Sequence, residues 1–158
     1  MVDSTYKATA QELDKAILMA AKAHFGFTDK AGQPYTMHVL RVMMRGQTLM
    51  EQICGVLHDL IEDTPYTEHD LRAEGFSEDI IEVVKLLTHD KSLLSYEEYI
   101  QRLVKHPVAR KVKINDLLDN MDIRRLPTVK ERDLERSNKY LHYYRYLIQY
   151  DETASKPL

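Results

Sequence analysis

The sequence contains no tryptophan and a single cysteine, Cys54, in 158 residues. One cysteine excludes a disulfide framework, and its place in an apolar segment predicts a buried thiol in a reducing cytosol. Glycine and proline number only five each, which argues against a turn-rich, many-stranded β architecture. No apolar run approaches the roughly 20 residues of a transmembrane helix, and the N-terminus lacks a signal pattern. We therefore expect a soluble cytoplasmic protein with no membrane partner.

An excess of charge of one sign is also missing. The net charge is −3, which gives no general electrostatic case for nucleic acid as a partner. Hydrophobic residues make up 44% of the chain, so the protein is globular rather than disordered. We find no internal repeat, low-complexity segment or linker. These features predict one domain spanning residues 1–158, long enough to bury a sizeable core.

What the sequence does contain is a series of helix-start signals. Thr9 with Glu12, and Ser95 with Glu98, form capping boxes in front of apolar stripes at helical spacing. No segment alternates with period two over a useful length. We therefore predict an all-α fold, a compact bundle of seven or eight helices. The predicted helices begin near Thr9, Pro34, Leu49, Thr67, Ser77, Ser95, Pro107 and Thr128.

The central predicted helix, from about Leu49 to Asp63, carries four ionisable residues inside an apolar run: His58, Asp59, Glu62 and Asp63. Side chains three or four residues apart share a helix face, so all four would crowd the last two turns. Burying three carboxylates this close together without a partner costs several kcal/mol each. A bound divalent cation is the simplest compensation for that cost.

A divalent ion held by nitrogen and oxygen atoms usually takes four or more of them, so further donors are required. His38, near the start of the preceding helix and flanked by apolar residues, is the best third candidate. The fourth donor should come from a distant helix, where Asp116 and Asn120 lie four residues apart on an apolar stripe. We expect both to point inward, and Asp119 and Asp122 to lie on a solvated face.

The order of His38, then His58-Asp59, then Asp116 resembles the H…HD…D pattern of the HD phosphohydrolase superfamily. The resemblance is closest to the hydrolase domain of RelA/SpoT-type enzymes and to their small stand-alone, metazoan-type relatives. Three blocks of sequence carry it: 23–38, 56–64 and 112–120. With the helices between them they span about residues 10–148, the expected core of the domain, and they imply the HD-domain fold.

The resemblance implies a Mn²⁺-dependent hydrolase that removes pyrophosphate from the 3′ position of (p)ppGpp, a small-molecule nucleotide, and leaves GDP or GTP. The implied ligands of one metal ion are His38, His58, Asp59 and Asp116. The implied catalytic residues, which handle the attacking water, are Glu62 and Asp63. Their separate roles stay open because two adjacent carboxylates titrate as a coupled pair. The implied substrate-binding residues are Lys30, Lys91, Lys113, Asn120, Arg136 and Tyr140.

Two departures from the family pattern concern recognition of the base. The longer enzymes carry an arginine that stacks on guanine at the position that Asp29 occupies here. An aspartate can neither stack nor donate to a base edge as a guanidinium does. The family motif A-D-R-L-H-N reads Asn-Asp-Leu-Leu-Asp-Asn at residues 115–120 and so loses an arginine and a histidine. The metal and water machinery is therefore expected to be intact, while base recognition differs.

Three alternatives remain open. Asp29 favours an HD phosphohydrolase that acts on another nucleotide, such as ppApp, the 2′-phosphate of NADPH or a deoxynucleotide. A non-catalytic nucleotide sensor would be expected to lack Glu62 and Asp63, yet both are present. A purely structural helical adaptor leaves the crowded carboxylates unexplained. The sequence leaves the oligomeric state open.

Overall fold

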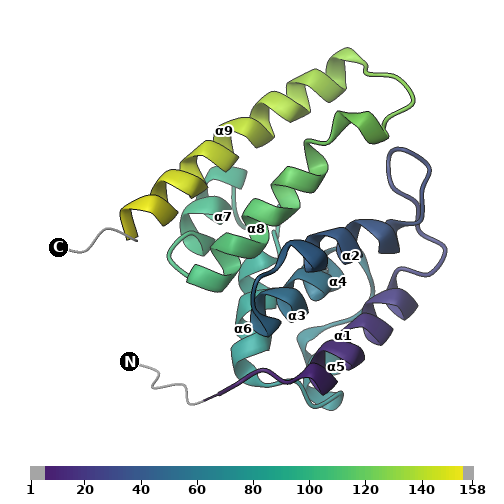
Figure 1. The fold of residues 1–158 in the computed structure, drawn as a ribbon, viewed down its shortest axis with the longest axis vertical. Coiled ribbons are helices and arrows are strands. Elements are labelled where there is room, and N and C mark those ends of the chain that lie inside the picture. The colour runs from purple at the N-terminus through teal and green to yellow at the C-terminus, as the bar shows by residue number, and fades with distance from the viewer. Residues whose placement is uncertain (1–5, 155–158) are drawn as a thin grey trace.

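The computed structural model describes residues 6–154. In that range its regular elements are helices joined by loops, and the only β-structure is one isolated bridge between Thr28 and Pro34 (Figure 1). This confirms the predicted all-α class. The elements are α1 (Ala10–Ala23), α2 (Tyr35–Arg45), α3 (Leu49–Leu57), α4 (Leu60–Asp63), α5 (Glu68–Ala73), α6 (Glu78–Leu87), α7 (Tyr96–Leu103), α8 (Pro107–Asn120), the short 3₁₀ helix η1 (Ile123–Arg125) and α9 (Glu131–Ala154). Since α3 and α4 are the two parts of one predicted helix, the number of helices agrees with the prediction.

The helix starts that the sequence marks with capping boxes are confirmed. At the start of α1, the Thr9 N–H donates to Glu12 Oε2 at 2.9 Å, and the Glu12 N–H donates to Thr9 Oγ1 at 3.2 Å. Ser95 and Glu98 make the same reciprocal pair at the start of α7. Each box pairs backbone N–H groups that the first turn of a helix leaves without intrahelical partners.

Helix α3 lies at the centre of the bundle. It packs against α1, α2, α6 and α8, and its residues from Ile53 to Leu57 are all buried. A helix that is apolar on every side is stable only where other helices surround it. Close packing with α2 is possible because Gly55 has no side chain: a β-carbon there would lie 3.2 Å from Met43 Cα. This approach brings the rings of His38 and His58 to a centroid distance of 5.2 Å.

The prediction of one continuous helix from Leu49 to Asp63 is wrong at its centre. Helix α3 ends at Leu57, α4 begins at Leu60, and Asp59 between them has φ −99° and ψ 2°. Nδ1 of His58 lies 2.6 Å from the Gly55 carbonyl oxygen, which a continuous helix would pair with the N–H of Asp59. The side chain of His58 competes for that carbonyl, and the helix breaks at the His-Asp pair.

Helix α9 lies alongside α8 and closes one side of the bundle (Figure 1). Its exposed residues outnumber its buried ones, and it turns Arg136 and Tyr140 toward the cavity described below. Within residues 6–154, no helix has the combination of length and apolar character needed to cross a membrane.

Candidate functional site

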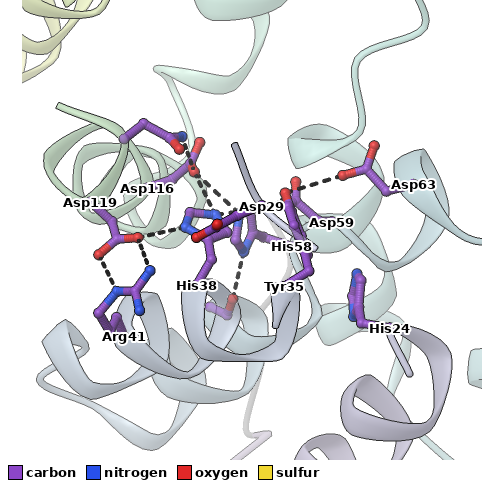
Figure 2. Close-up of polar contacts among 12 residues, drawn as sticks. His24, Asp29, Tyr35, His38, Arg41, His58, Asp59, Asp63, Asp116 and Asp119 are labelled. Atoms are coloured by element: carbon purple, nitrogen blue, oxygen red, sulfur yellow. Dashed lines mark hydrogen bonds and ion pairs between the residues drawn. The ribbon is translucent and has the colours of Figure 1, made fainter. Parts of the chain in front are cut away.

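Four of the predicted donors meet at one point between α2, α3 and α8 (Figure 2). Nε2 of His58 lies 3.0 Å from Asp59 Oδ2 and 3.3 Å from Asp116 Oδ1. Nε2 of His38 lies 3.2 Å from the same Asp116 oxygen and 3.5 Å from the same Asp59 oxygen. Two imidazole nitrogens and two carboxylate oxygens therefore face a common centre, with both histidines almost fully buried.

The outer nitrogen of each imidazole is held by a partner that sets the direction of the ring. His58 Nδ1 is 2.6 Å from the Gly55 carbonyl oxygen, and His38 Nδ1 is 2.7 Å from Asp119 Oδ2. Because both partners are acceptors, each Nδ1 donates to its partner, so a neutral ring would present its Nε2 lone pair to a cation. Nε2 of His58 is buried and makes no hydrogen bond to the described residues. The donor set therefore fits a divalent metal ion.

The pKa values of the histidines and aspartates in the cluster also indicate a place for positive charge. Burial lowers the pKa of His58, but the carboxylates of Asp59 and Asp116 outweigh burial and raise this pKa to about 10. Burial raises the pKa of Asp59, whereas the imidazoles of His58 and His38 lower it well below its usual range. The protonated histidines therefore balance the two carboxylates, and a divalent cation bound between them would displace those protons.

Asp119 corrects the sequence-based expectation, which placed it on a solvated face. Its side chain is 1% exposed and, besides binding His38, accepts from Arg41 Nε at 2.7 Å and from Arg45 NH1 at 3.1 Å. Burial raises the pKa of Asp119, but the hydrogen bonds from His38 and Arg41 lower it well below its usual range. Arg41 and Arg45 lie on the face of α2 that carries His38, one turn apart, and the packing of α2 against α8 brings Asp119 to all three.

Glu62 and Asp63 lie beside the four-donor cluster, at the end of α4. Oxygen atoms of Asp59, Glu62 and Asp63 lie within 4.8 Å of one another. Glu62 Oε1 accepts from the N–H of His89 at 2.6 Å. Burial raises the pKa of Glu62, and the charge of Asp59 raises it further. The hydrogen bond from the His89 N–H lowers it, but the net shift is upward. Burial and Asp59 likewise raise the pKa of Asp63. A carboxylate with a raised pKa is a stronger base toward water.

The cluster forms one end of a cavity of about 450 Å³, a volume typical of small-molecule sites. All six residues proposed to bind the substrate line it: Lys30, Lys91, Lys113, Asn120, Arg136 and Tyr140. Lys113 Nζ is 2.8 Å from Asp116 Oδ2 and 5.3 Å from the ring centre of Tyr99. Burial lowers the pKa of Lys113, but Asp116 raises it well above its usual value, so the ammonium group keeps its charge.

The lining of the cavity also carries positive charge, beside seven acidic residues. Lys30 and Lys91 make no ion pair with the side chains of residues 6–151. Burial, together with the charge of Arg136, lowers the pKa of Lys30. Arg136 is paired with Asp133. Six basic residues in the lining of a cavity that also contains candidate metal ligands suit a ligand with several phosphate groups.

Asp29 lies at the wall of the same cavity and has a structural role there. Its Oδ1 accepts from the N–H groups of Ala31 and Gln33 at 2.9 Å each, which closes the loop before α2. Its Oδ2 accepts from Arg125 NH1 at 2.8 Å. Arg125 also lines the cavity. The cavity wall therefore contains the guanidinium group of Arg125, which belongs to η1 and is held in place by Asp29.

No family model matches the chain. The guanosine-3′,5′-bis(diphosphate) 3′-pyrophosphohydrolase of Aquifex aeolicus is 28% identical over 129 residues, which cover 75% of this chain and 18% of that protein. The bifunctional (p)ppGpp synthase/hydrolase SpoT of Escherichia coli strain K12 is 31% identical over 128 residues, which cover 70% and 18%. The chain thus spans less than a fifth of the length of these two relatives.

A solved structure of a metazoan ortholog of SpoT, a protein that hydrolyzes ppGpp, has the same fold. Its TM-score is 0.69 at 22% sequence identity, with 92% of this chain and 88% of that chain covered. The chain therefore has the all-α, HD-like fold of that structure, and its described residues include a His/Asp group that could hold a metal ion. Among proteins with this fold, the chain is a relative of the RelA/SpoT-type hydrolases.

Proposed function

We propose that this chain is a Mn²⁺-dependent hydrolase that removes the 3′-pyrophosphate of (p)ppGpp and releases GDP or GTP. The observation that carries the proposal is the four-donor cluster, of which His38, Asp59 and Asp116 line a cavity together with Glu62, Asp63 and six basic residues. The names of the sequence relatives supply the substrate. Mn²⁺ is the metal that the resemblance to RelA/SpoT-type hydrolases implies, and the two carboxylates of the cluster suit it.

The four ligands in this proposal are His38, His58, Asp59 and Asp116. When bound, the ion polarises a phosphoryl oxygen and makes its water more acidic. Glu62 then takes a proton from the attacking water, and Asp63 orients that water or shares the proton. The hydrogen bond from the His89 N–H holds the Glu62 carboxylate at the cavity wall.

The lysines and arginines of the cavity bind the phosphates of the substrate. Lys113, held between Asp116 and two tyrosine rings, places one positive charge beside the metal site. Lys30, Lys91 and Arg136 bind the phosphates further out. Asn120 and Tyr140, on α8 and α9, contact the nucleoside. The same arrangement would serve a nucleotide with another base, and Asp29 is the observation that favours that second candidate.

Product analysis against a panel of nucleotides tests the proposal. The Mn²⁺-loaded protein is incubated with ppGpp, ppApp, NADPH and deoxynucleotides, and pyrophosphate and orthophosphate are quantified separately. We expect pyrophosphate from ppGpp, and loss of this activity on chelation of the metal. Turnover of another nucleotide alone would contradict the proposed substrate and support the second candidate. Binding of ppGpp without any turnover would identify a sensor instead.

A further inference from the structure

The hydroxyl group of Tyr35 lies between a candidate metal ligand and a candidate catalytic carboxylate (Figure 2). Tyr35 is the first residue of α2 and lines the cavity. Its hydroxyl donates to Asp59 Oδ2 at 2.6 Å and, less closely, to Asp63 Oδ2 at 3.3 Å. Carboxylates only accept, so the single phenolic proton is shared between the two residues.

The oxygen that Tyr35 binds most closely is the one that faces the metal position. Oδ2 of Asp59 is also the atom that lies 3.0 Å from His58 Nε2 and 3.5 Å from His38 Nε2. A donor on that oxygen restricts rotation of the carboxylate and leaves its remaining lone pair directed at the cluster. Through its second contact the same hydroxyl restrains Asp63. One hydroxyl group therefore restrains both a candidate metal ligand and a carboxylate proposed to act on the attacking water.

The ring of Tyr35 is held from behind by His24. The two rings stack at a centroid distance of 5.2 Å and an interplanar angle of 29°. His24 is 1% exposed, and its Nδ1 lies 2.9 Å from the Ala20 carbonyl oxygen. Burial, followed by the charge of Asp59, raises the pKa of the Tyr35 phenol, so Tyr35 remains a hydrogen-bond donor.

We propose that Tyr35 is a positioning residue whose hydroxyl ties Asp59 to Asp63 and so sets the attacking water relative to the metal ion. Its part in turnover rests on the proposed hydrolase function. Its part in metal binding rests on the geometry of Asp59 alone.

The variant Tyr35→Phe removes one oxygen and keeps the ring that stacks on His24. We expect Mn²⁺ affinity, measured from the electron paramagnetic resonance signal of the free ion, to fall about tenfold. At saturating metal, kcat should fall about 10- to 100-fold, while KM stays within about twofold because no substrate contact is lost. Tyr6→Phe is the matched control, since Tyr6 also donates to a carboxylate, Glu12 Oε1, at 2.7 Å but lies away from the cavity.

If Tyr35→Phe has the same Mn²⁺ affinity and the same kcat as Tyr6→Phe, the proposal is overturned. If the wild-type protein proves inactive on ppGpp, the proposed function fails, yet the comparison of Mn²⁺ affinities still decides whether Tyr35 positions Asp59. Melting of the metal-free variants verifies that each is folded.

If Tyr35→Phe does not fold, His24→Ala is the second variant, because it keeps the Tyr35 hydroxyl but removes the ring that stacks on Tyr35. His24→Ala should then weaken Mn²⁺ binding, and wild-type affinity in that variant overturns the proposal.

Discussion

Replacing Glu62 with glutamine is expected to leave metal binding unchanged and to lower kcat by about 100- to 10,000-fold, the usual contribution of a general base. Glutamine keeps an oxygen that can accept the hydrogen bond from the His89 N–H, so the end of α4 should keep its structure. What it loses is the ability to take a proton from water. The measurements are Mn²⁺ titration and steady-state kinetics with ppGpp.

The pH profile provides a second readout for Glu62→Gln. The pKa values of Glu62 and Asp63 are both raised by burial and by the charge of Asp59. A base works when it is deprotonated, so wild-type activity should be present above the raised pKa and fall as the pH drops through it. Glu82→Gln, on the exposed face of α6, is the matched control and should behave as wild type. Near-normal turnover of Glu62→Gln would rule out Glu62 as the base.

Replacing Asp116 with asparagine is expected to abolish the stabilisation that the metal gives to the fold. A ligand present at 100 times its Kd stabilises a native protein by about 2.7 kcal/mol. Wild-type protein should therefore unfold at higher denaturant concentration with Mn²⁺ than with chelator, whereas Asp116→Asn should unfold at the same concentration in both. Asparagine is chosen rather than alanine because it keeps the size of the side chain and one acceptor oxygen. That oxygen can still accept from Lys113, which donates to Oδ2 of Asp116, or from Asn120, which donates to Oδ1.

Comparison of each variant with and without metal separates ligand loss from general destabilisation. Loss of the Asp116 charge leaves the buried Lys113 ammonium without its ion partner, which lowers stability in both conditions. Only the difference between the two conditions reports metal binding. Asp122→Asn, six residues beyond Asp116, should keep the full difference. If Asp116→Asn also keeps it, the fourth ligand is another residue.

Much of the fold could be predicted from local signals. The capping boxes at Thr9 and Ser95 and the absence of period-two patterns depend on neighbouring residues alone, and the structure confirms both. The interruption between α3 and α4 could not be predicted in this way. It depends on the His58 side chain turning back to the Gly55 carbonyl, whereas periodicity indicates a continuous helix over the same residues.

The candidate site shows the same division between local and tertiary information. His58 and Asp59 can be identified from the sequence alone, because ionisable residues inside an apolar run need a partner such as a bound cation. Asp119 was placed on a solvated face because its position on α8 falls beside the stripe of Asp116. Which flank of α8 meets α2 is decided by packing over a sequence separation of about 80 residues, and the sequence does not state it. Tyr35 was missed for a similar reason, since its hydroxyl reaches Asp59 from the preceding helix.

The central claim is that His38, His58, Asp59 and Asp116 hold one divalent ion beside Glu62 and Asp63. The most direct test is a crystal structure of the Mn²⁺-loaded protein with an anomalous difference map recorded near the manganese absorption edge. We expect one strong peak between the four side chains, about 2 Å from both Nε2 atoms. A peak held by Glu62 and Asp63 without the histidines, or no peak in the cluster at saturating Mn²⁺, would contradict the account.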